Sequence, residues 1–530
     1  MISEISSRAS PAAWALRMNV RRLGCGIVVV AADLVRYRIS KGRWLSCPIS
    51  MDPCLSLPSS SRMGNIRSGY RVRLRNAMWR AAPGVNMTVG STGRDAAGRA
   101  PELGEMVSLV AFSPHNDGSA GAVRQESRDP SGRWRALVGL GVAMLLAMTT
   151  WFSASAVLPQ LRIQWNLSSI QASLLTIAVQ MGFVVGATVS VVFNLADVVA
   201  PRRLMFFGAV GAAFVNALLI VSHGVGVAVP LRFATGVFLA AVYPPALKAM
   251  ATWFRRGRGT ALGVMVGALT LGSATPYLVN GLGGVRWQAV IGVTSLLTLV
   301  GGLLAEFVAS DGPFSFPAAA TFDSRQVRRS FAHRGVRLAT LGYFGHMWEL
   351  YAMWSWFAAF FADVLARHGF DDPRRGAAFA AFAVIGVGAA GSVVGGVLGD
   401  RWGRTRLTAL AMVLSASSAV LIGLIRTQPV VVVLLLGLFW GFWVVADSAQ
   451  FSAIVTELAD QAYVGTALTL QLAVGFTLSV LTIWLVPVLR DHLSWQWAFA
   501  FLAPGPAVGA VAMIRLLRSP DAALIAGGKG

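Results

Sequence analysis

Between two long apolar runs the chain carries the charged stretch Gly396-Val397-Leu398-Gly399-Asp400-Arg401-Trp402-Gly403-Arg404-Thr405-Arg406. An aspartate and three arginines so close together are costly inside a bilayer, because charge in the hydrocarbon is expensive. Arginines are common in short cytoplasmic loops of membrane proteins. The stretch therefore predicts a cytoplasmic loop between two membrane helices.

The composition supports a membrane protein. Hydrophobic residues make up 55% of the 530 residues and charged residues 13%, and the mean hydropathy is +0.63. A soluble domain carries roughly 25% charged residues. The net charge of +22 would favour a nucleic-acid partner in a soluble protein, but arginines in cytoplasmic loops explain it here. We expect no nucleic-acid partner.

The sequence lacks the patterns of several function classes. It contains no Gly-x-x-x-x-Gly-Lys-Ser/Thr stretch, so ATP-driven transport by this chain alone is not supported. Cys25, Cys47 and Cys54 have no metal-like spacing and imply no disulfide framework. We expect no enzyme activity, no cofactor and no metal. The low lysine content is typical of a GC-rich bacterial genome.

Residues 1–130 differ from the rest of the chain, with scattered arginines and no sustained periodicity. Their one apolar run, Gly24–Val35, is shorter than the roughly 20 residues that a membrane helix needs. No convincing cleavage site for a signal peptide follows it. We expect a disordered basic extension. It is either a cytoplasmic tail attracted to anionic lipid or read-through upstream of a true start such as Met106.

Apolar stretches of roughly 20 residues, the length of a membrane helix, recur from Arg133 onward. They predict an all-α membrane protein with twelve transmembrane helices. We expect an N-terminal six-helix bundle over 131–308, a basic cytoplasmic connector at 309–335, a C-terminal six-helix bundle over 336–518 and a tail at 519–530. The expected helices are 136–158, 170–193, 203–222, 226–250, 259–281, 287–308, 336–361, 375–398, 405–425, 429–452, 463–488 and 495–517.

The arginines indicate the orientation. With both termini inside, the loops on that side hold more than twice as many arginines as the opposite loops, as the positive-inside rule requires. We therefore expect a multi-pass protein of the bacterial inner membrane with cytoplasmic termini.

The two halves repeat three landmarks in the same order, which predicts two pseudo-symmetric bundles. Parallel six-helix halves related by an axis along the membrane normal are a known plan of secondary transporters. The landmarks are Asp197–Arg203 and Asp400–Arg404, Gly259–Leu262 and Gly465–Leu468, and Arg286–Ala289 and Ser494–Ala498.

With these motifs, residues from about 133 to 518 resemble a complete transporter of the major facilitator superfamily. In that family the charged loop belongs to a charge relay that holds the cytoplasmic side closed, so the resemblance implies a gate. The alternative for Asp400 is simple solvation at a helix end. The first-half loop departs from the family pattern by lacking both glycines and one arginine. The implied gate residues are Gly396, Asp400, Arg401, Gly403 and Arg404 in the second half and Asp197, Arg202 and Arg203 in the first.

Arg232 on the fourth expected helix belongs to Arg232-Phe-Ala-Thr-Gly236, which resembles the family's Arg-x-x-x-Gly element. The resemblance implies that Arg232 faces the central cavity, where it could bind an anion or influence a proton site. The alternative is that its side chain snorkels to the outer interface.

Three further ionisable residues lie within expected membrane helices. His346 and Glu349 are three residues apart and share a helix face. A histidine beside a carboxylate could exchange protons in the physiological range. The alternative is an interhelical hydrogen-bonded pair with no part in transport. Asp447 is a second buried carboxylate, and the repeat places its stretch opposite Tyr243-Pro244-Pro245.

These features predict a secondary active transporter of a small solute that works by alternating access. The first choice is a monomeric, proton-coupled symporter in contact with membrane lipid, with a slight preference for an anionic substrate. The alternatives are an efflux carrier for drugs or metabolites and a transporter-like membrane sensor that moves nothing.

The candidate site leads to a first prediction. If Glu349 carries the coupling proton, the Glu349→Gln variant should lose uphill accumulation while expression and counterflow persist. Uptake in proteoliposomes under a pH gradient measures this, and full pH-driven uptake by the variant would rule out a coupling role for Glu349.

Overall fold

The structure is a computed structural model. It describes residues 14–23, 27–39, 43–47, 130–193, 195–254, 257–282, 286–310, 312–314, 331, 333–459 and 464–530. The chain divides into two compact units, Met1–Asp117 and Gly118–Gly530.

The first unit contains a three-stranded antiparallel sheet in the order β1-β2-β3. Its strands are β1 (Trp14–Leu23), β2 (Ile27–Ile39) and β3 (Arg43–Cys47). The apolar run at the start of β2 is continuous rather than alternating, so the sequence pattern does not indicate a strand there. Most of residues 1–130 lie outside the described residues, and the disordered extension stays a prediction.

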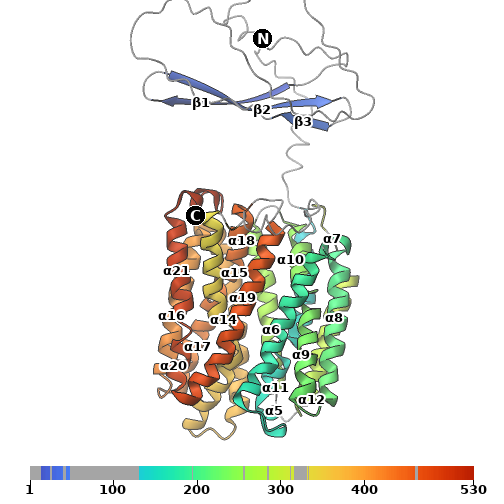
Figure 1. Ribbon diagram of the computed structural model, residues 1–530, viewed down its shortest axis with the longest axis vertical. Coiled ribbons are helices and arrows are strands. Elements are labelled where there is room, and N and C mark those ends of the chain that lie inside the picture. Colours follow the sequence, from blue (N-terminus) through green and yellow to red (C-terminus); the bar gives the residue numbers. More distant parts are fainter. Residues whose placement is uncertain are drawn as a thin grey trace, which may run out of the picture. The chain divides into compact units, whose positions relative to one another are not determined.

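The second unit is a bundle of long helices (Figure 1). Its first half contains α3 (Arg133–Ala147), η1 (Met148–Thr150), α4 (Ser153–Ala156), α5 (Leu158–Gln164), α6 (Ser169–Val192), α7 (Leu195–Val198), α8 (Pro201–Ala217), η2 (Leu218–Val221), α9 (Val225–Leu239), α10 (Tyr243–Ala251), α11 (Arg258–Gly281) and α12 (Trp287–Phe307). Its second half contains α14 (Arg334–Arg367), α15 (Pro373–Trp402), α16 (Arg404–Leu424), α17 (Val430–Ala446), α18 (Ser448–Leu458), α19 (Val464–His492), α20 (Trp495–Ala500), α21 (Pro504–Leu517) and η3 (Pro520–Leu524).

Ten helical segments among the described residues are long and apolar enough to cross a membrane. The first and seventh expected spans complete the set of twelve. The first is divided into α3, η1, α4 and α5, so no single piece is long enough. The seventh, α14, is long but carries His346, Glu349 and several tyrosines and tryptophans, which lower its hydropathy. The predicted twelve-helix, two-bundle membrane fold is confirmed.

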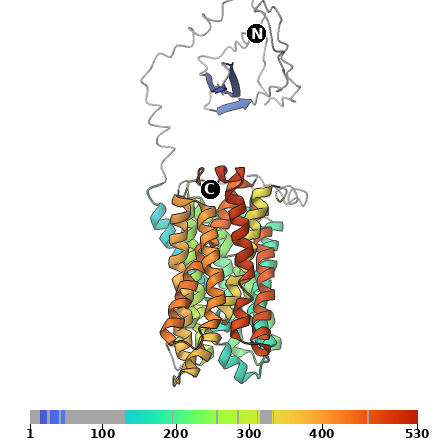
Figure 2. The same ribbon diagram turned by 90° about the vertical axis from the view of Figure 1, so that its left-hand side faces the viewer.

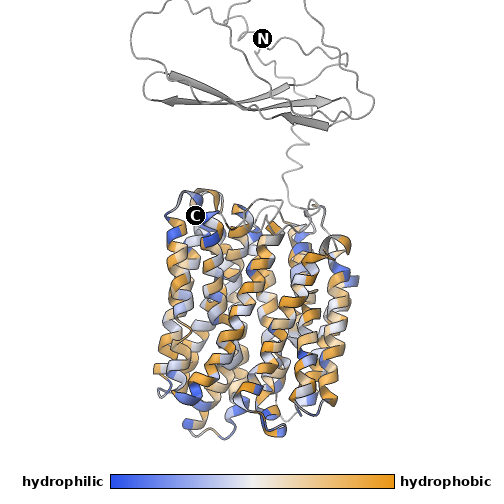
Figure 3. Cartoon of the chain, viewed as in Figure 1, coloured by the Kyte–Doolittle hydropathy of each residue, from blue (hydrophilic) through white to orange (hydrophobic). Residues whose placement is uncertain are grey.

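The helices run side by side along the long axis of the unit (Figures 1 and 2). Apolar residues cover its sides and polar residues gather at its two ends (Figure 3), as expected for a bundle in lipid. One end carries α7, the ends of α10 and α18, and residue 530. We call it the terminal end and the other the opposite end. The connector at 309–335 lies largely outside the described residues.

The halves meet along two pairs of helices, α11 with α15 and α6 with α19. Small residues allow the first pair to approach closely. A Cβ atom added at Gly263 of α11 would lie 2.4 Å from the backbone oxygen of Ser392 in α15. At the opposite end the Arg375 side chain of α15 donates to the backbone oxygen of Gly281, 3.1 Å away. The halves are therefore in contact along the whole length of this pair.

Two membrane helices are broken at corresponding positions in the two halves. The fourth span breaks between α9 and α10, where Pro244 and Pro245 occupy the first turn of α10. Proline lacks an N–H group, so it fits a first turn and cannot continue a preceding helix. The tenth span breaks at Asp447, between α17 and α18. A break leaves backbone N–H and C=O groups without their helical partners. Within a membrane this is tolerated only where protein or a water-filled cavity surrounds those groups.

Packing within the second half leads to a stability prediction. Gly441 of α17 faces α15 so closely that an added Cβ atom would lie 1.9 Å from the backbone oxygen of Val384. We expect Gly441→Ala to cost about 1–3 kcal/mol through overpacking and to lower the melting temperature of the purified protein by roughly 3 °C or more. Gly386→Ala on α15 is the matched control, because its nearest neighbour is Leu271 Cδ1 at 3.6 Å. Equal melting temperatures for the two variants would contradict the packing.

Candidate functional site

Asp400, at the end of α15, connects the two halves at the terminal end. Its Oδ2 atom accepts hydrogen bonds from the backbone N–H of Thr260 at 3.0 Å and from the Thr260 hydroxyl at 3.2 Å. Thr260 lies in the first turn of α11, whose N–H groups have no partner within the helix. A carboxylate is favoured there by the positive end of the helix dipole. Asp400 of the second half thus caps a helix of the first.

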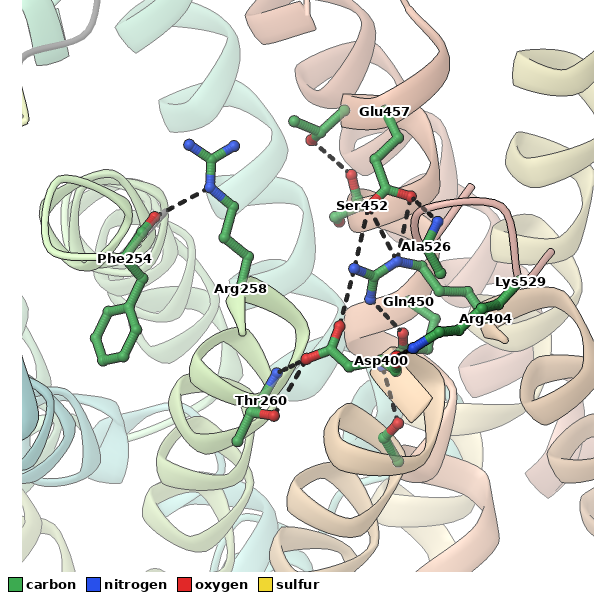
Figure 4. A network of polar contacts seen from close by, with 12 residues as sticks. Phe254, Arg258, Thr260, Asp400, Arg404, Gln450, Ser452, Glu457, Ala526 and Lys529 are labelled. Atoms are coloured by element: carbon green, nitrogen blue, oxygen red, sulfur yellow. Dashed lines mark hydrogen bonds and ion pairs between the residues drawn. The ribbon is translucent and has the colours of Figure 1, made fainter. Parts of the chain in front are cut away.

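Arg404, at the start of α16, fixes this carboxylate (Figure 4). Its Nη2 atom lies 3.0 Å from Asp400 Oδ1 and 3.1 Å from Glu457 Oε1, and Nη1 donates to Gln450 Oε1 at 2.9 Å. The Arg404 side chain is 5% exposed, so these contacts satisfy a charge that water barely reaches. We call Thr260, Asp400, Arg404, Gln450 and Glu457 the latch.

The other expected gate residues have different positions. Gly396 packs against the backbone of Gly259 in α11, and Gly403 makes the turn from α15 to α16 with φ of +113°, a conformation that favours glycine. Arg401 is exposed. In the first half, Arg203 lies 3.8 Å from Glu306 of α12.

The side chain of Asp197 lies outside the described residues. The described contacts between the halves at this level therefore come from the second-half loop.

His346 of α14 pairs with Asp447, and not with its helix neighbour Glu349. Its Nδ1 atom lies 2.9 Å from Asp447 Oδ1, and its Nε2 atom lies 2.9 Å from the Ser448 hydroxyl. Both members of the pair are 3% exposed. The break between α17 and α18 aims Asp447 and Ser448 at the same imidazole, one at each ring nitrogen.

Glu349 lies in a separate environment between α14, α16 and α17. Its two carboxylate oxygens accept hydrogen bonds from the Ser415 hydroxyl and the Trp440 indole N–H, both at 2.7 Å. The side chain is buried. This geometry matches an interhelical hydrogen-bonded group, because both oxygens are satisfied by neighbouring helices.

Arg232 of α9 is fully buried and contacts the break in the first membrane helix. Its guanidinium donates to the backbone oxygens of Thr150, at 3.0 Å, and Trp151. It also donates to Asn216 Oδ1 at 2.9 Å and to the Ser153 hydroxyl at 3.2 Å. Thr150 ends η1 and Trp151 follows it, at a point where the helix stops and carbonyl groups lack their usual N–H partners. A cation at a helix C-terminus is also favoured by the dipole.

This placement of Arg232 differs from both sequence-based expectations. Its side chain does not snorkel to an interface, because it is 0% exposed. It is also absent from the residues that line the cavity described next. The sequence marked the residue as unusual, but the broken helix that it contacts could not be read from local pattern.

A small cavity of about 40 Å³ lies between the halves, large enough for a few water molecules. Its polar lining includes Tyr243, Thr270, Tyr343, His346, Ser448 and Ser452, and its apolar lining includes Met347, Leu350 and Phe476. Tyr243 and Ser448 both line this cavity, so the two stretches that the repeat pairs lie near one another. Apart from tyrosines, His346 is the one ionisable side chain among the described residues that line it.

An aromatic cluster from both halves adjoins this cavity. Trp151 of the first half stacks on Tyr351 of the second with ring centroids 5.9 Å apart, and Phe183 contacts Phe476 at 4.6 Å. Phe152 meets Trp354 edge to face at 5.9 Å. Phe476 also belongs to the cavity lining. These ring contacts pack the two halves against one another beside the cavity.

Sequence reasoning missed three residues of these sites and two further buried amides. Ser415, Trp440 and Glu457 had no motif, and only their contacts with Glu349 and Arg404 reveal them. Gln180 of α6 and Gln471 of α19 are buried amides without hydrogen-bond partners among the described residues. Glutamine inside an apolar run is the signal that could have found the last two.

Comparisons with known proteins agree with this architecture. The family model of the Major Facilitator Superfamily matches residues 140–366 and 347–529. No curated relative matches the chain. Among solved structures, the chain is similar to a bacterial homologue of the human lysosomal transporter Spinster in an inward-facing, unoccupied conformation. That likeness has a TM-score of 0.52 and 14% identity over 73% of this chain and 96% of the other, and it supports the fold alone.

The contacts of Arg232 lead to a prediction. Arg232→Gln leaves buried carbonyl groups of the first helix without donors, each at a cost of about 1–3 kcal/mol. We expect a large fall in the melting temperature of the purified protein. Arg367→Gln, at an exposed arginine that ends α14, should change it little. An Arg232→Gln variant with normal stability but no transport would instead place the residue in solute or proton binding.

Proposed function

Because the chain belongs to the major facilitator superfamily and is a membrane transporter, we propose that it carries a small solute across the bacterial inner membrane by proton-coupled alternating access. The observation that carries the proposal is a buried His346–Asp447 pair whose histidine lines a cavity between the two halves. Ionisable groups within membrane helices usually mark ion or substrate pathways.

Two closures between the halves support alternating access. The latch joins α11 to α15 at the terminal end. At the opposite end the Ser169 hydroxyl of α6 donates to Asp491 of α19 at 2.7 Å, and Arg375 bonds the backbone of Gly281. Both sets are small and polar, so each can separate in water when the halves rock. The cavity lies in the path that such rocking would open.

Proton coupling is assigned to the His346–Asp447 pair, with Ser448 as the contact to the cavity. With one proton between them, the pair is either an imidazolium beside a carboxylate or a neutral imidazole beside a carboxylic acid, and its net charge is zero in both forms; loss of that proton leaves a net charge of −1. Gain or loss of the proton changes the charge at the cavity wall, and the 3% exposure of both groups makes that change strongly felt. Glu349 is the second candidate for the coupling proton, because it is also a buried ionisable residue of α14. It ranks below the pair because its oxygens are bonded to Ser415 and Trp440, which do not line the cavity.

The cavity lining supports a solute with an apolar or planar body and hydrogen-bonding groups. Tyrosine and serine hydroxyls can position polar atoms, while Met347, Leu350 and Phe476 offer apolar surface. The preference for an anionic solute rests on Arg232 alone, and the guanidinium of Arg232 is occupied by Thr150, Asn216 and their neighbours.

The orientation is proposed from charge. The terminal end holds the arginine-rich turns and is assigned to the cytoplasm by the positive-inside rule, so both termini are cytoplasmic. We propose a monomer, because a complete pair of bundles already encloses the path.

The proposal is tested by flux in proteoliposomes after a thermal-shift screen has identified a solute. We expect an inward proton gradient to drive accumulation. Asp447→Asn should abolish accumulation while counterflow persists, because the pair can no longer release and regain a proton. Loss of accumulation in Glu349→Gln but not in Asp447→Asn would move the proton site to Glu349.

Other outcomes favour the alternatives. Solute movement against the direction of the applied proton gradient would indicate efflux by antiport. Binding without any flux would indicate a sensor, and transport that ignores the pH gradient would remove the proton from the mechanism.

A further inference from the structure

The residues after α21 fold back onto the terminal end. They form η3 (Pro520–Leu524) and then a tight hook, in which Gly528 and Gly530 donate backbone hydrogen bonds to Ile525 at 3.0 and 3.3 Å. Ile525 is fully buried. Ala526 adopts φ of +50°, which is uncommon for a residue other than glycine. The hook therefore has a defined conformation, and it contacts one particular part of the terminal end.

The docking place is the turn between α15 and α16. The Lys529 ammonium donates to the backbone oxygen of Asp400 at 2.9 Å, and the Thr405 N–H donates to the backbone oxygen of Gly530 at 3.3 Å. Gly403 allows this approach, because a Cβ atom there would lie 2.6 Å from the backbone oxygen of Lys529. Lys529 also places a positive charge at the C-terminal end of α15, where the dipole favours it.

A second contact reaches the side chains of the latch (Figure 4). The Ala526 N–H donates to Glu457 Oε2 at 3.0 Å, while Oε1 of the same carboxylate lies 3.1 Å from Arg404. Arg404 in turn holds Asp400, which bonds Thr260 of the other half. A continuous line of hydrogen bonds and ion pairs therefore runs from the hook to the interface between the halves.

We propose that residues 519–530 act as a strap that holds Asp400, Arg404 and Glu457 in the arrangement that closes the terminal end, and that release of the strap favours its opening. The inference rests on the alternating access proposed above. Asp400 can bond Thr260 only while its backbone and carboxylate stay in place. The strap holds the backbone of Asp400 through Lys529, and it holds the carboxylate of Asp400 through Glu457 and Arg404. Loss of the strap therefore shifts the protein toward conformations in which the terminal end is open.

The test measures opening of the terminal end without a solute. In a chain with Cys25, Cys47 and Cys54 replaced by serine, Ser452→Cys places a thiol in the cavity lining. The rate of its reaction with a membrane-impermeant maleimide is followed in inside-out vesicles. Ala526→Pro cannot adopt positive φ and has no N–H for Glu457, so it releases the hook. We expect labelling roughly tenfold faster, the weight of one hydrogen bond to a charged group.

Matched variants distinguish release of the strap from a general loss of folding. Ala526→Gly keeps both the N–H and the backbone conformation and should label at the parent rate. Lys529→Ala removes only the contact to the backbone oxygen of Asp400, so it should give a smaller increase in the labelling rate. This variant tests the strap if Ala526→Pro does not express. In right-side-out vesicles none of the variants should label faster. Equal rates for Ala526→Pro and Ala526→Gly, or faster labelling from both faces, would overturn the strap. If the variants label as expected but the protein shows no solute flux, the strap is supported and the proposed transport is ruled out.

Discussion

The hydrocarbon of a bilayer offers no hydrogen-bond partner, so a charged group or a backbone N–H or C=O group placed in it is costly unless the protein satisfies it. This constraint governs the interior of the second unit. Arg232 is fully buried and satisfied by backbone oxygens, Asn216 and Ser153, and Glu349 by Ser415 and Trp440. Each of these two charged side chains therefore ties neighbouring helices within its own half together.

The same constraint explains how the helices can be broken. The first membrane helix stops at Trp151, and Arg232 supplies donors for the carbonyl groups exposed there. The break turns Trp151 and Phe152 toward the other half, where they meet Tyr351 and Trp354. In the tenth helix the break at Asp447 gives His346 its partner. The first break therefore places aromatic rings against residues that line the cavity, and the second places a carboxylate beside the histidine that lines it.

Contacts between the halves differ in kind along the bundle. Near the middle they are aromatic rings, whose packing excludes water, and at the terminal end they are charges and hydrogen bonds close to water. Polar contacts of this second kind exchange readily with solvent, so their strength depends on how well the partners are held. Glu457 and the residues after α21 hold Arg404 and Asp400 in this way.

The sequence by itself determined the twelve membrane helices, their division into two similar halves and the charged turn at Asp400. The lengths of the apolar runs, the distribution of arginines and the internal repeats can all be read directly from the sequence. It also marked Arg232, His346, Glu349 and Asp447, because charge in an apolar run is visible at once. Only the tertiary structure decided their partners. Helix spacing placed His346 beside Glu349, whereas packing of α14 against α18 gave it Asp447, since contacts between helices distant in sequence depend on how whole helices pack.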